Sequence, residues 1–200
     1  MAALTFPYSM AATPSSMLAL GTPAPEFSLP DVTTGKPLSL RDFSEKKALV
    51  VVFLCAHCPY VHHVAPELAR LSQDYTDSNV GIVGITSNDV AQYPADAPEP
   101  TARFAQSSGI TFPIVYDESQ DVAKAYAAAC TPDFYVFNAD RKLVYRGQLD
   151  ASRPNRGADR PGGGELNGAA LRAAIEAALA GQPASEKQAA SIGCSIKWKS

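Results

Sequence analysis

The most constraining feature of the sequence is a short apolar run, ALVVVFL (residues 48–54), that leads directly into a pair of cysteines. Continuous apolar runs of this length are typical of strands buried on both faces of a parallel sheet. A second such run, VGIVGIT (80–86), follows a segment whose apolar residues recur every three or four positions. That spacing predicts a helix over 59–74 with one apolar face. Two buried strands joined by a helix predict a βαβ unit with parallel strands.

The rest of the sequence continues to alternate strand and helix patterns. The resulting order, β-α-β-α-β-α-β-β-α, begins with parallel strands and closes with a hairpin and a helix. That order matches the thioredoxin fold, so the sequence predicts an α/β protein, a thioredoxin-like α/β/α sandwich with a central mixed β-sheet. The expected later elements are a helix over 100–108, a strand over 112–116, a helix over 119–129, strands over 134–138 and 142–147, and a helix over 168–180 capped by Asn167.

The length of 200 residues suggests one domain with additions at its edges. We expect an N-terminal arm over 1–20, a thioredoxin-like domain over 21–181 and a C-terminal tail over 182–200. The arm has no Lys or Arg, and Pro and Ser interrupt its apolar residues, so it is unlike a secretory signal. The Gly-, Pro- and Arg-rich segment 153–167 is expected to be a solvated connection.

Composition and charge exclude several classes of partner. Hydrophobic residues make up 46% of the chain, which is enough for a sizeable core, and the formal net charge is −3. The absence of a basic stripe argues against a nucleic-acid partner. No apolar run approaches the roughly 20 residues of a membrane span. We therefore expect a cytoplasmic protein, in which four cysteines are too few for a disulfide scaffold.

The spacing Cys55-x-x-Cys58 allows several kinds of site. A structural zinc site needs four ligands, and the sequence has no second C-x-x-C, although His57, His62 and His63 are near. His62 and His63 are expected to lie on the solvated face of the helix. A static disulfide across so short a loop would constrain little of the unfolded chain. The sequence therefore favours no metal site and no structural bridge here.

A redox pair has direct physical support at this position. The cysteines lie where a buried strand gives way to a helix, whose free N–H groups and positive dipole end stabilise a thiolate. A lowered pKa is expected to make Cys55 the nucleophile. Cys58 then resolves the mixed disulfide, and an external reductant resets the pair without an organic cofactor. Pro59 suits the first turn of a helix because its missing N–H is no loss there.

The later stretch CTPDFYVF strengthens this interpretation. C-x-x-C near a βαβ pattern is a thioredoxin-like signal, and here a Thr-Pro pair precedes a strand. We expect a cis Thr131–Pro132 bond that lies against the cysteines, although a trans proline that opens a strand is the alternative. The backbone of Thr131 could then bond a substrate chain.

The segment GTPAPEFSLPD resembles the opening of the redoxin (AhpC/TSA-like) branch of the thioredoxin-like superfamily. The resemblance runs from about residue 21 to 150, and the stretches SNDVAQYPADAPE, AACTPDFYVF, ASRPN and GCSIKWK resemble a bacterial subgroup of thiol-disulfide oxidoreductases. The resemblance implies a disulfide-containing protein or small thiol as substrate and a thioredoxin- or glutathione-type reductant. The motif G-x-x-A-P-x-F-x-L-x-D is carried by Gly21, Ala24, Pro25, Phe27, Leu29 and Asp31.

The same branch contains peroxiredoxins, which act as antioxidants and carry P-x-x-x-T/S-x-x-C. Aligning its cysteine with Cys58 puts Cys55 where Thr or Ser belongs and Val51 where Pro belongs. The Arg that peroxiredoxins place near the Thr131–Pro132 loop is also missing. These departures favour dithiol exchange, with a thiol peroxidase as the alternative because an exposed low-pKa thiolate reacts slowly with peroxide. A metal-binding C-x-x-C module is the third candidate.

Two further cysteines are possible accessory thiols. Cys130 precedes Thr131, so it is either near the pair or a small buried apolar residue. Cys194 lies in the tail, where it could pair with Cys130, relay electrons or have no role. Chain ends usually fray, but the tail carries three apolar residues that could dock: Ile192, Ile196 and Trp198.

The dipeptide between the cysteines, Ala56–His57, should tune the redox potential. It resembles the C-x-H-C of protein disulfide isomerases, and a histidine that stabilises the adjacent thiolate makes the disulfide more oxidising. We expect a potential of roughly −180 to −230 mV, above that of thioredoxin. His57→Pro should lower this potential in a redox titration. An unchanged potential would identify His57 as a solvent-facing residue with little effect.

Overall fold

A five-stranded sheet forms the centre of the computed structural model, which describes residues 12–158 and 161–200. Its strand order is β6-β5-β4-β8-β9. The first three of these strands are mutually parallel, and β8 and β9 are antiparallel to their neighbours. The predicted α/β class and mixed central sheet are confirmed. The strands are β4 (Ala48–Phe53), β5 (Val80–Thr86), β6 (Ile114–Tyr116), β8 (Asp133–Phe137) and β9 (Leu143–Gly147).

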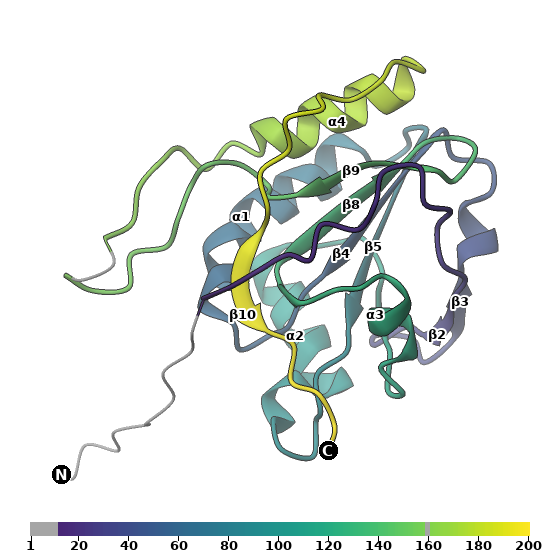
Figure 1. The fold of residues 1–200 in the computed structure, drawn as a ribbon. Coiled ribbons are helices and arrows are strands. Elements are labelled where there is room, and N and C mark those ends of the chain that lie inside the picture. The colour runs from purple at the N-terminus through teal and green to yellow at the C-terminus, as the bar shows by residue number, and fades with distance from the viewer. Residues whose placement is uncertain (1–11, 159–160) are drawn as a thin grey trace, which may run out of the picture.

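Helices cover both faces of this sheet (Figure 1). Three of them share a core with one face, and the other face packs against α3 and a 3-10 helix, η1. Within the described residues, none of the helices combines the length and the apolar character that crossing a membrane requires. The first group is α1 (Pro59–Asp74), α2 (Pro98–Ser108) and α4 (Ala169–Leu179), and the second is α3 (Asp121–Ala125) and η1 (Leu40–Phe43).

Strand β4 lies in the middle of the sheet, and all of its residues are buried. Alternate side chains of a strand point to opposite faces, so Val50 and Val52 join the core under α1 and α4, whereas Val51 and Phe53 join the other core. The continuous apolar run in the sequence is explained by this two-sided burial.

The helix predicted over 119–129 is much shorter than expected, because α3 ends at Ala125. Tyr126 turns into the core, where its ring packs edge-on against Phe53 with centroids 5.5 Å apart. Ala127 then takes a left-handed backbone conformation with φ of 50°. The chain therefore leaves the helix early and enters a short strand, β7 (Cys130–Thr131).

The two ends of the described chain meet in a second sheet, of order β1-β10-β7 (Figure 1). Strands β1 (Ala12–Pro14) and β10 (Ile192–Ser195) come from the predicted arm and tail, and all pairings are antiparallel. Residues 1–11 of the arm lie outside the described residues. Of the apolar tail residues, Ile196 is buried, whereas Ile192 and Trp198 remain exposed.

Smaller elements complete the fold. Strands β2 (Ser28–Pro30) and β3 (Pro37–Ser39) form a two-stranded antiparallel hairpin. A second 3-10 helix, η2 (Pro94–Asp96), lies in the loop that connects β5 to α2. Gly168, rather than the predicted Asn167, is the N-cap residue of α4, although the Asn167 side chain still accepts a hydrogen bond from the N–H of Ala169.

Asp133, the first residue of β8, is a buried acid that ties the N-terminal segment to the sheet. One carboxylate oxygen accepts hydrogen bonds from Ser15 Oγ at 3.0 Å and from the Tyr135 hydroxyl at 2.9 Å. The other oxygen has no hydrogen-bond partner among the described residues. Burial raises the pKa of Asp133 to about 6, despite these hydrogen bonds.

This raised pKa predicts a pH dependence of stability. Between about pH 4 and 6 the native state holds a proton that the unfolded state has lost, so the free energy of unfolding should fall as pH rises. The shift from 3.8 to about 6 corresponds to about 3 kcal/mol. Asp133→Asn should remove this slope in urea unfolding measured across the interval. The exposed Asp140→Asn is the control, and equal slopes in both variants would contradict the assignment.

Candidate active site

Cys55 and Cys58 lie at the junction between β4 and α1, as predicted. The strand ends at Phe53, Ala56 and His57 form a turn, and α1 begins at Pro59. Cys58 is the N-cap residue of the helix, with an extended backbone (φ −77°, ψ 124°). The free N–H groups of the first helical turn therefore face Cys58 more directly than Cys55.

Thr131 brings the two sulfurs to one place. Because β8 pairs with β4, the residues that precede β8 lie beside the end of β4. Thr131 Oγ1 is 3.2 Å from Cys55 Sγ, and the Thr131 carbonyl oxygen is 3.2 Å from Cys58 Sγ, from which it accepts a hydrogen bond when Cys58 is a thiol. The peptide bond between Thr131 and Pro132 is cis. Both predicted substrate-binding residues thus lie at the cysteine pair.

Of the two accessory thiols, Cys194 joins the pair and Cys130 does not. Cys194 Sγ is 2.9 Å from Cys58 Sγ. Cys194 lies opposite Thr131 in the pairing of β10 with β7. Cys130 is fully buried, its sulfur is 3.9 Å from the Pro132 carbonyl oxygen, and burial raises the pKa of its thiol. The site therefore contains three cysteines, and Cys130 is a buried core residue.

The thiolate is favoured at Cys58. Burial raises the pKa of Cys58, but hydrogen bonds from Cys194 and Cys55 and from the backbone N–H of Val61 outweigh it and hold this pKa well below its ordinary value. The pKa of Cys55 is raised, because its thiol donates to Cys58, is buried and lies near the charge of Asp96. The expected lowering of the Cys55 pKa is therefore wrong. The helix begins one residue after Cys58, so its N-terminus acts on the second cysteine.

A buried carboxylate holds His57, the residue expected to tune the pair. Asp96, in η2, accepts hydrogen bonds from His57 N at 3.1 Å, His57 Nδ1 at 2.5 Å and Asn88 Nδ2 at 2.8 Å. The His57 ring also stacks on Tyr93, with centroids 5.6 Å apart. Sequence reasoning missed Asp96, whose only signal was its place in a Pro- and Asp-rich loop.

The contact with Asp96 sets the charge of His57. The hydrogen bond to Asp96 raises the pKa of His57, burial opposes it, and the charges of Asp96 and Cys58 raise it further. An imidazolium near a thiolate stabilises both charges. His57 therefore reinforces the thiolate at Cys58, whereas Asp96 disfavours a charge on Cys55.

Within the part of the chain that the structure describes, Cys55, His57 and Asp96 form a group that could hold a metal ion. Each offers one ligand atom, and these atoms lie within 4.8 Å of one another. Three protein ligands are the usual set of a catalytic zinc site. The two nearby histidines point elsewhere: His62 is exposed and packs edge-on against Phe104, and His63 hydrogen-bonds Ser152.

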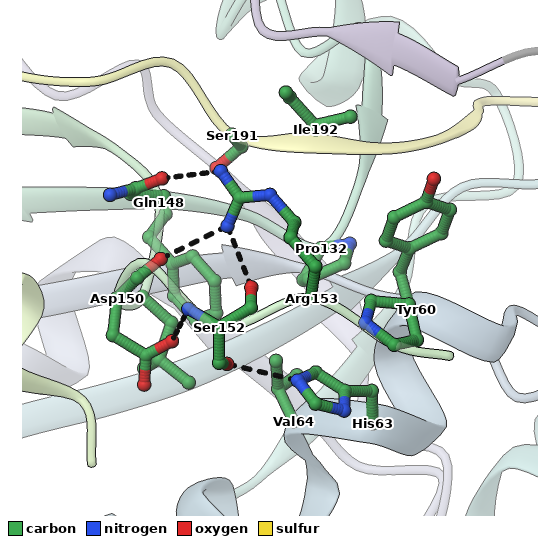
Figure 2. Close-up of a pocket in the computed structure, with 13 residues that line it drawn as sticks. Tyr60, His63, Val64, Pro132, Gln148, Asp150, Ser152, Arg153, Ser191 and Ile192 are labelled. Atoms are coloured by element: carbon green, nitrogen blue, oxygen red, sulfur yellow. Dashed lines mark hydrogen bonds between the residues drawn. The ribbon is translucent and has the colours of Figure 1, made fainter. Parts of the chain in front are cut away.

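A small hollow lies beside Pro132, which is one of its lining residues (Figure 2). The Arg153 side chain extends across it, and its guanidinium donates to Gln148 Oε1 at 2.7 Å. His63, from α1, also lines it and is hydrogen-bonded to Ser152. The volume of about 20 Å³ has room for about one water molecule. The hollow is therefore too small to hold a substrate in this conformation.

The sulfurs of the site are shielded from solvent. Cys55 is 1% exposed, Cys58 is fully buried and Cys194 is 1% exposed. The loop that carries Asp96 meets His57, and β10 lies over Cys58. A bulky substrate can reach a sulfur only if one of these segments moves.

Comparisons with known proteins place the chain among redox proteins. The Redoxin family model matches residues 19–160. A crystal structure of an uncharacterized conserved protein from Geobacillus kaustophilus is 51% identical, covers 96% of this chain and 98% of its own, and has a TM-score of 0.89. Thiol-disulfide oxidoreductase ResA of Halalkalibacterium halodurans is 28% identical over 64% of this chain and 68% of its own. Peroxiredoxin Bcp of Escherichia coli is 29% identical over 54% and 64%.

The His57–Asp96 contact predicts a change that NMR can measure. Asp96→Asn removes the charge and the strong acceptor that raise the pKa of His57, so this pKa should fall. The pH titration of the His57 ring carbon-bound protons reports it. The ring of His62, which packs on Phe104, is the internal reference. An unchanged titration of His57 in the variant would contradict the assigned contact.

Proposed function

The chain belongs to the Redoxin family, and from this we propose that it is a thiol-disulfide oxidoreductase with Cys55 and Cys58 as its redox pair. Relatives with oxidoreductase and peroxiredoxin names support an oxidoreductase role in general terms. One observation carries the finer proposal: both sulfurs meet Thr131 at the N-terminus of α1, where a thiolate is stabilised.

The proposed reaction is an exchange of disulfides. The Cys58 thiolate attacks a substrate disulfide, forms a mixed disulfide and releases one substrate thiolate. Cys55 then gives up its proton, attacks Cys58 Sγ and releases the second substrate sulfur, which takes up that proton. The first substrate thiolate takes its proton from solvent, so a Cys55–Cys58 disulfide remains and the substrate has gained two electrons and two protons. We assign the first attack to Cys58, in contrast to the sequence-based expectation, because hydrogen bonds favour its thiolate.

The substrate and the reductant are proposed from the same chemistry. The substrate is a disulfide-containing protein or a small thiol compound in its disulfide form. A thioredoxin- or glutathione-type thiol returns two electrons and resets the pair. A protein substrate that pairs with the Thr131 edge has to take the place of β10, which occupies that edge.

A second candidate, peroxide reduction, is favoured by the properties of Cys58. Cys58 is the residue that aligns with the peroxidatic cysteine, and its thiolate is favoured. A peroxide is far smaller than a peptide chain, so it needs a smaller opening of the site than a substrate that pairs with Thr131. It would oxidise Cys58 to a sulfenic acid, which condenses with a neighbouring thiol to a disulfide and water. Cys55 and Cys194 are both close enough to supply that thiol.

Two variants separate these functions. With insulin as substrate and dithiothreitol as reductant, Cys55→Ser and Cys58→Ser should each lower reduction by at least about a hundred-fold. A protein substrate that takes the place of β10 also moves Cys194 away from Cys58, so only Cys55 can resolve the mixed disulfide with insulin. Peroxide consumption, by contrast, should need Cys58 and largely survive Cys55→Ser, because Cys194 remains beside Cys58. Cys130→Ala is the matched control with one thiol fewer. Full insulin reduction by Cys55→Ser would refute the proposed pair.

A further inference from the structure

The C-terminal strand β10 pairs with the backbone of Thr131, the residue that contacts both Cys55 Sγ and Cys58 Sγ. Cys194 lies opposite Thr131, and Ser195 lies opposite Cys130, in an antiparallel pairing. On its other side β10 pairs with β1, which places it between two strands (Figure 1). The chain's own tail therefore lies where an extended substrate chain would pair with Thr131.

Gly193 makes this close approach possible. A Cβ atom at this position would lie 2.0 Å from the Thr131 carbonyl oxygen and 2.6 Å from its carbon. Any other residue would push β10 away from β7, since real side chains do not approach a backbone so closely. The glycine before Cys194 thus fixes how near this cysteine comes to Cys58.

Further hydrogen bonds hold the strand on both sides of Cys194. Before it, the Ser191 carbonyl accepts from the N–H of Ser15 at 2.9 Å. After it, the N–H of Ile196 donates to the Ala129 carbonyl at 3.1 Å, and the N–H of Lys197 donates to Asn88 Oδ1 at 2.8 Å. Asn88 also bonds Asp96, which joins the tail to the loop that holds His57. Cys194 is therefore built into the site.

We propose that Cys194 is a third redox residue that exchanges with the oxidised pair to form a Cys58–Cys194 disulfide, so that β10 acts as an internal substrate. The proposal rests on the function proposed above for Cys55 and Cys58. The positions of the two sulfurs that would bond support the step. Cys58 Sγ and Cys194 Sγ are 2.9 Å apart, and a disulfide bond of about 2.05 Å requires a further approach of about 1 Å.

The step is a disulfide exchange without an external oxidant. The Cys194 thiolate attacks Cys58 Sγ in the Cys55–Cys58 disulfide. The Cys58–Cys194 bond forms, the Cys55–Cys58 bond breaks, and its electron pair leaves on Cys55. Cys55 takes up the proton that Cys194 gave up, so the protein as a whole keeps the same number of disulfides.

The charges around Cys194 favour this step only after the pair is oxidised. In the reduced site the pKa of Cys194 is raised, first by its hydrogen bond to Cys58, then by burial and by the charge of Cys58. Oxidation of Cys58 removes its negative charge and the hydrogen bond that the thiolate accepts from Cys194. Both of these raise the pKa of Cys194 in the reduced site. The positive charges of Lys197 and Arg156, which lower the pKa of Cys194, remain. The thiolate at Cys194 is thus promoted when there is a disulfide to attack.

Disulfide mapping of the intact chain tests the proposal. Wild type, Cys55→Ser and Cys130→Ala are oxidised with glutathione disulfide, quenched with acid, alkylated and mapped by mass spectrometry. Wild type and Cys130→Ala should contain both Cys55–Cys58 and Cys58–Cys194. Cys55→Ser should convert a glutathione adduct on Cys58 into Cys58–Cys194 with release of glutathione. A persistent adduct on Cys58 beside a free Cys194 would overturn the proposal.

The wild-type map also separates the two proposals. A Cys55–Cys58 disulfide without any Cys58–Cys194 overturns the role of Cys194 and leaves the proposed function intact. Cys58–Cys194 without any Cys55–Cys58 overturns the proposed pair, and with it the exchange step. These results require no substitution, so a folding defect cannot mimic them.

Gly193→Ala tests the positioning by β10 while it keeps all four thiols. The added Cβ should displace the strand from Thr131. A displacement of about 1 Å can slow a reaction by about a hundred-fold, so Cys58–Cys194 should form at least about tenfold more slowly while the Cys55–Cys58 disulfide still forms. Circular dichroism of the variant verifies that it is folded. Formation at the wild-type rate in folded protein would overturn the role of the strand.

Discussion

The contacts of Thr131 are the constraint on which the rest of the site depends. Its hydroxyl meets Cys55, its carbonyl oxygen meets Cys58, and its backbone edge pairs with β10. These contacts are possible because β8 pairs with β4, so that the end of one strand and the start of the other lie side by side. The strand pairings therefore determine which sulfurs meet, and contacts with distant residues, Asp96 at Cys55 and Cys194 at Cys58, help to determine how each is charged.

Of the three sulfurs in the site, only Cys58 Sγ lies where a negative charge is stabilised. Cys58 is the N-cap residue of α1, and as a thiolate it accepts hydrogen bonds from two thiols and a backbone N–H. A second thiolate at Cys55 would lie near both Cys58 and the buried carboxylate of Asp96. Because adjacent like charges disfavour each other, the groups titrate as a unit. The reduced site thus holds one nucleophile flanked by two protonated partners.

Sequence reasoning succeeded where the signal was local and failed where contacts were distant. The apolar run over 48–54 and the helix over 59–74 follow from periodicity, and the structure confirms both. The predicted helix over 119–129 was too long because burial of Tyr126 against strands far along the chain ended it. The meeting of Cys194 with Cys58 joins residues far apart in sequence, so no local pattern could predict it.

The position of β10 imposes different conditions on the two candidate substrates. A polypeptide that pairs with Thr131 competes with a strand of the same chain, whose effective concentration is high because it is covalently attached. A peroxide or another small oxidant meets no such competitor, since it needs access only to the Cys58 sulfur. Hydrogen bonds at Ser191, Ile196 and Lys197 all hold β10 in its place beside Thr131. The balance between the two chemistries is therefore governed less by the cysteine pair than by how readily β10 leaves its place.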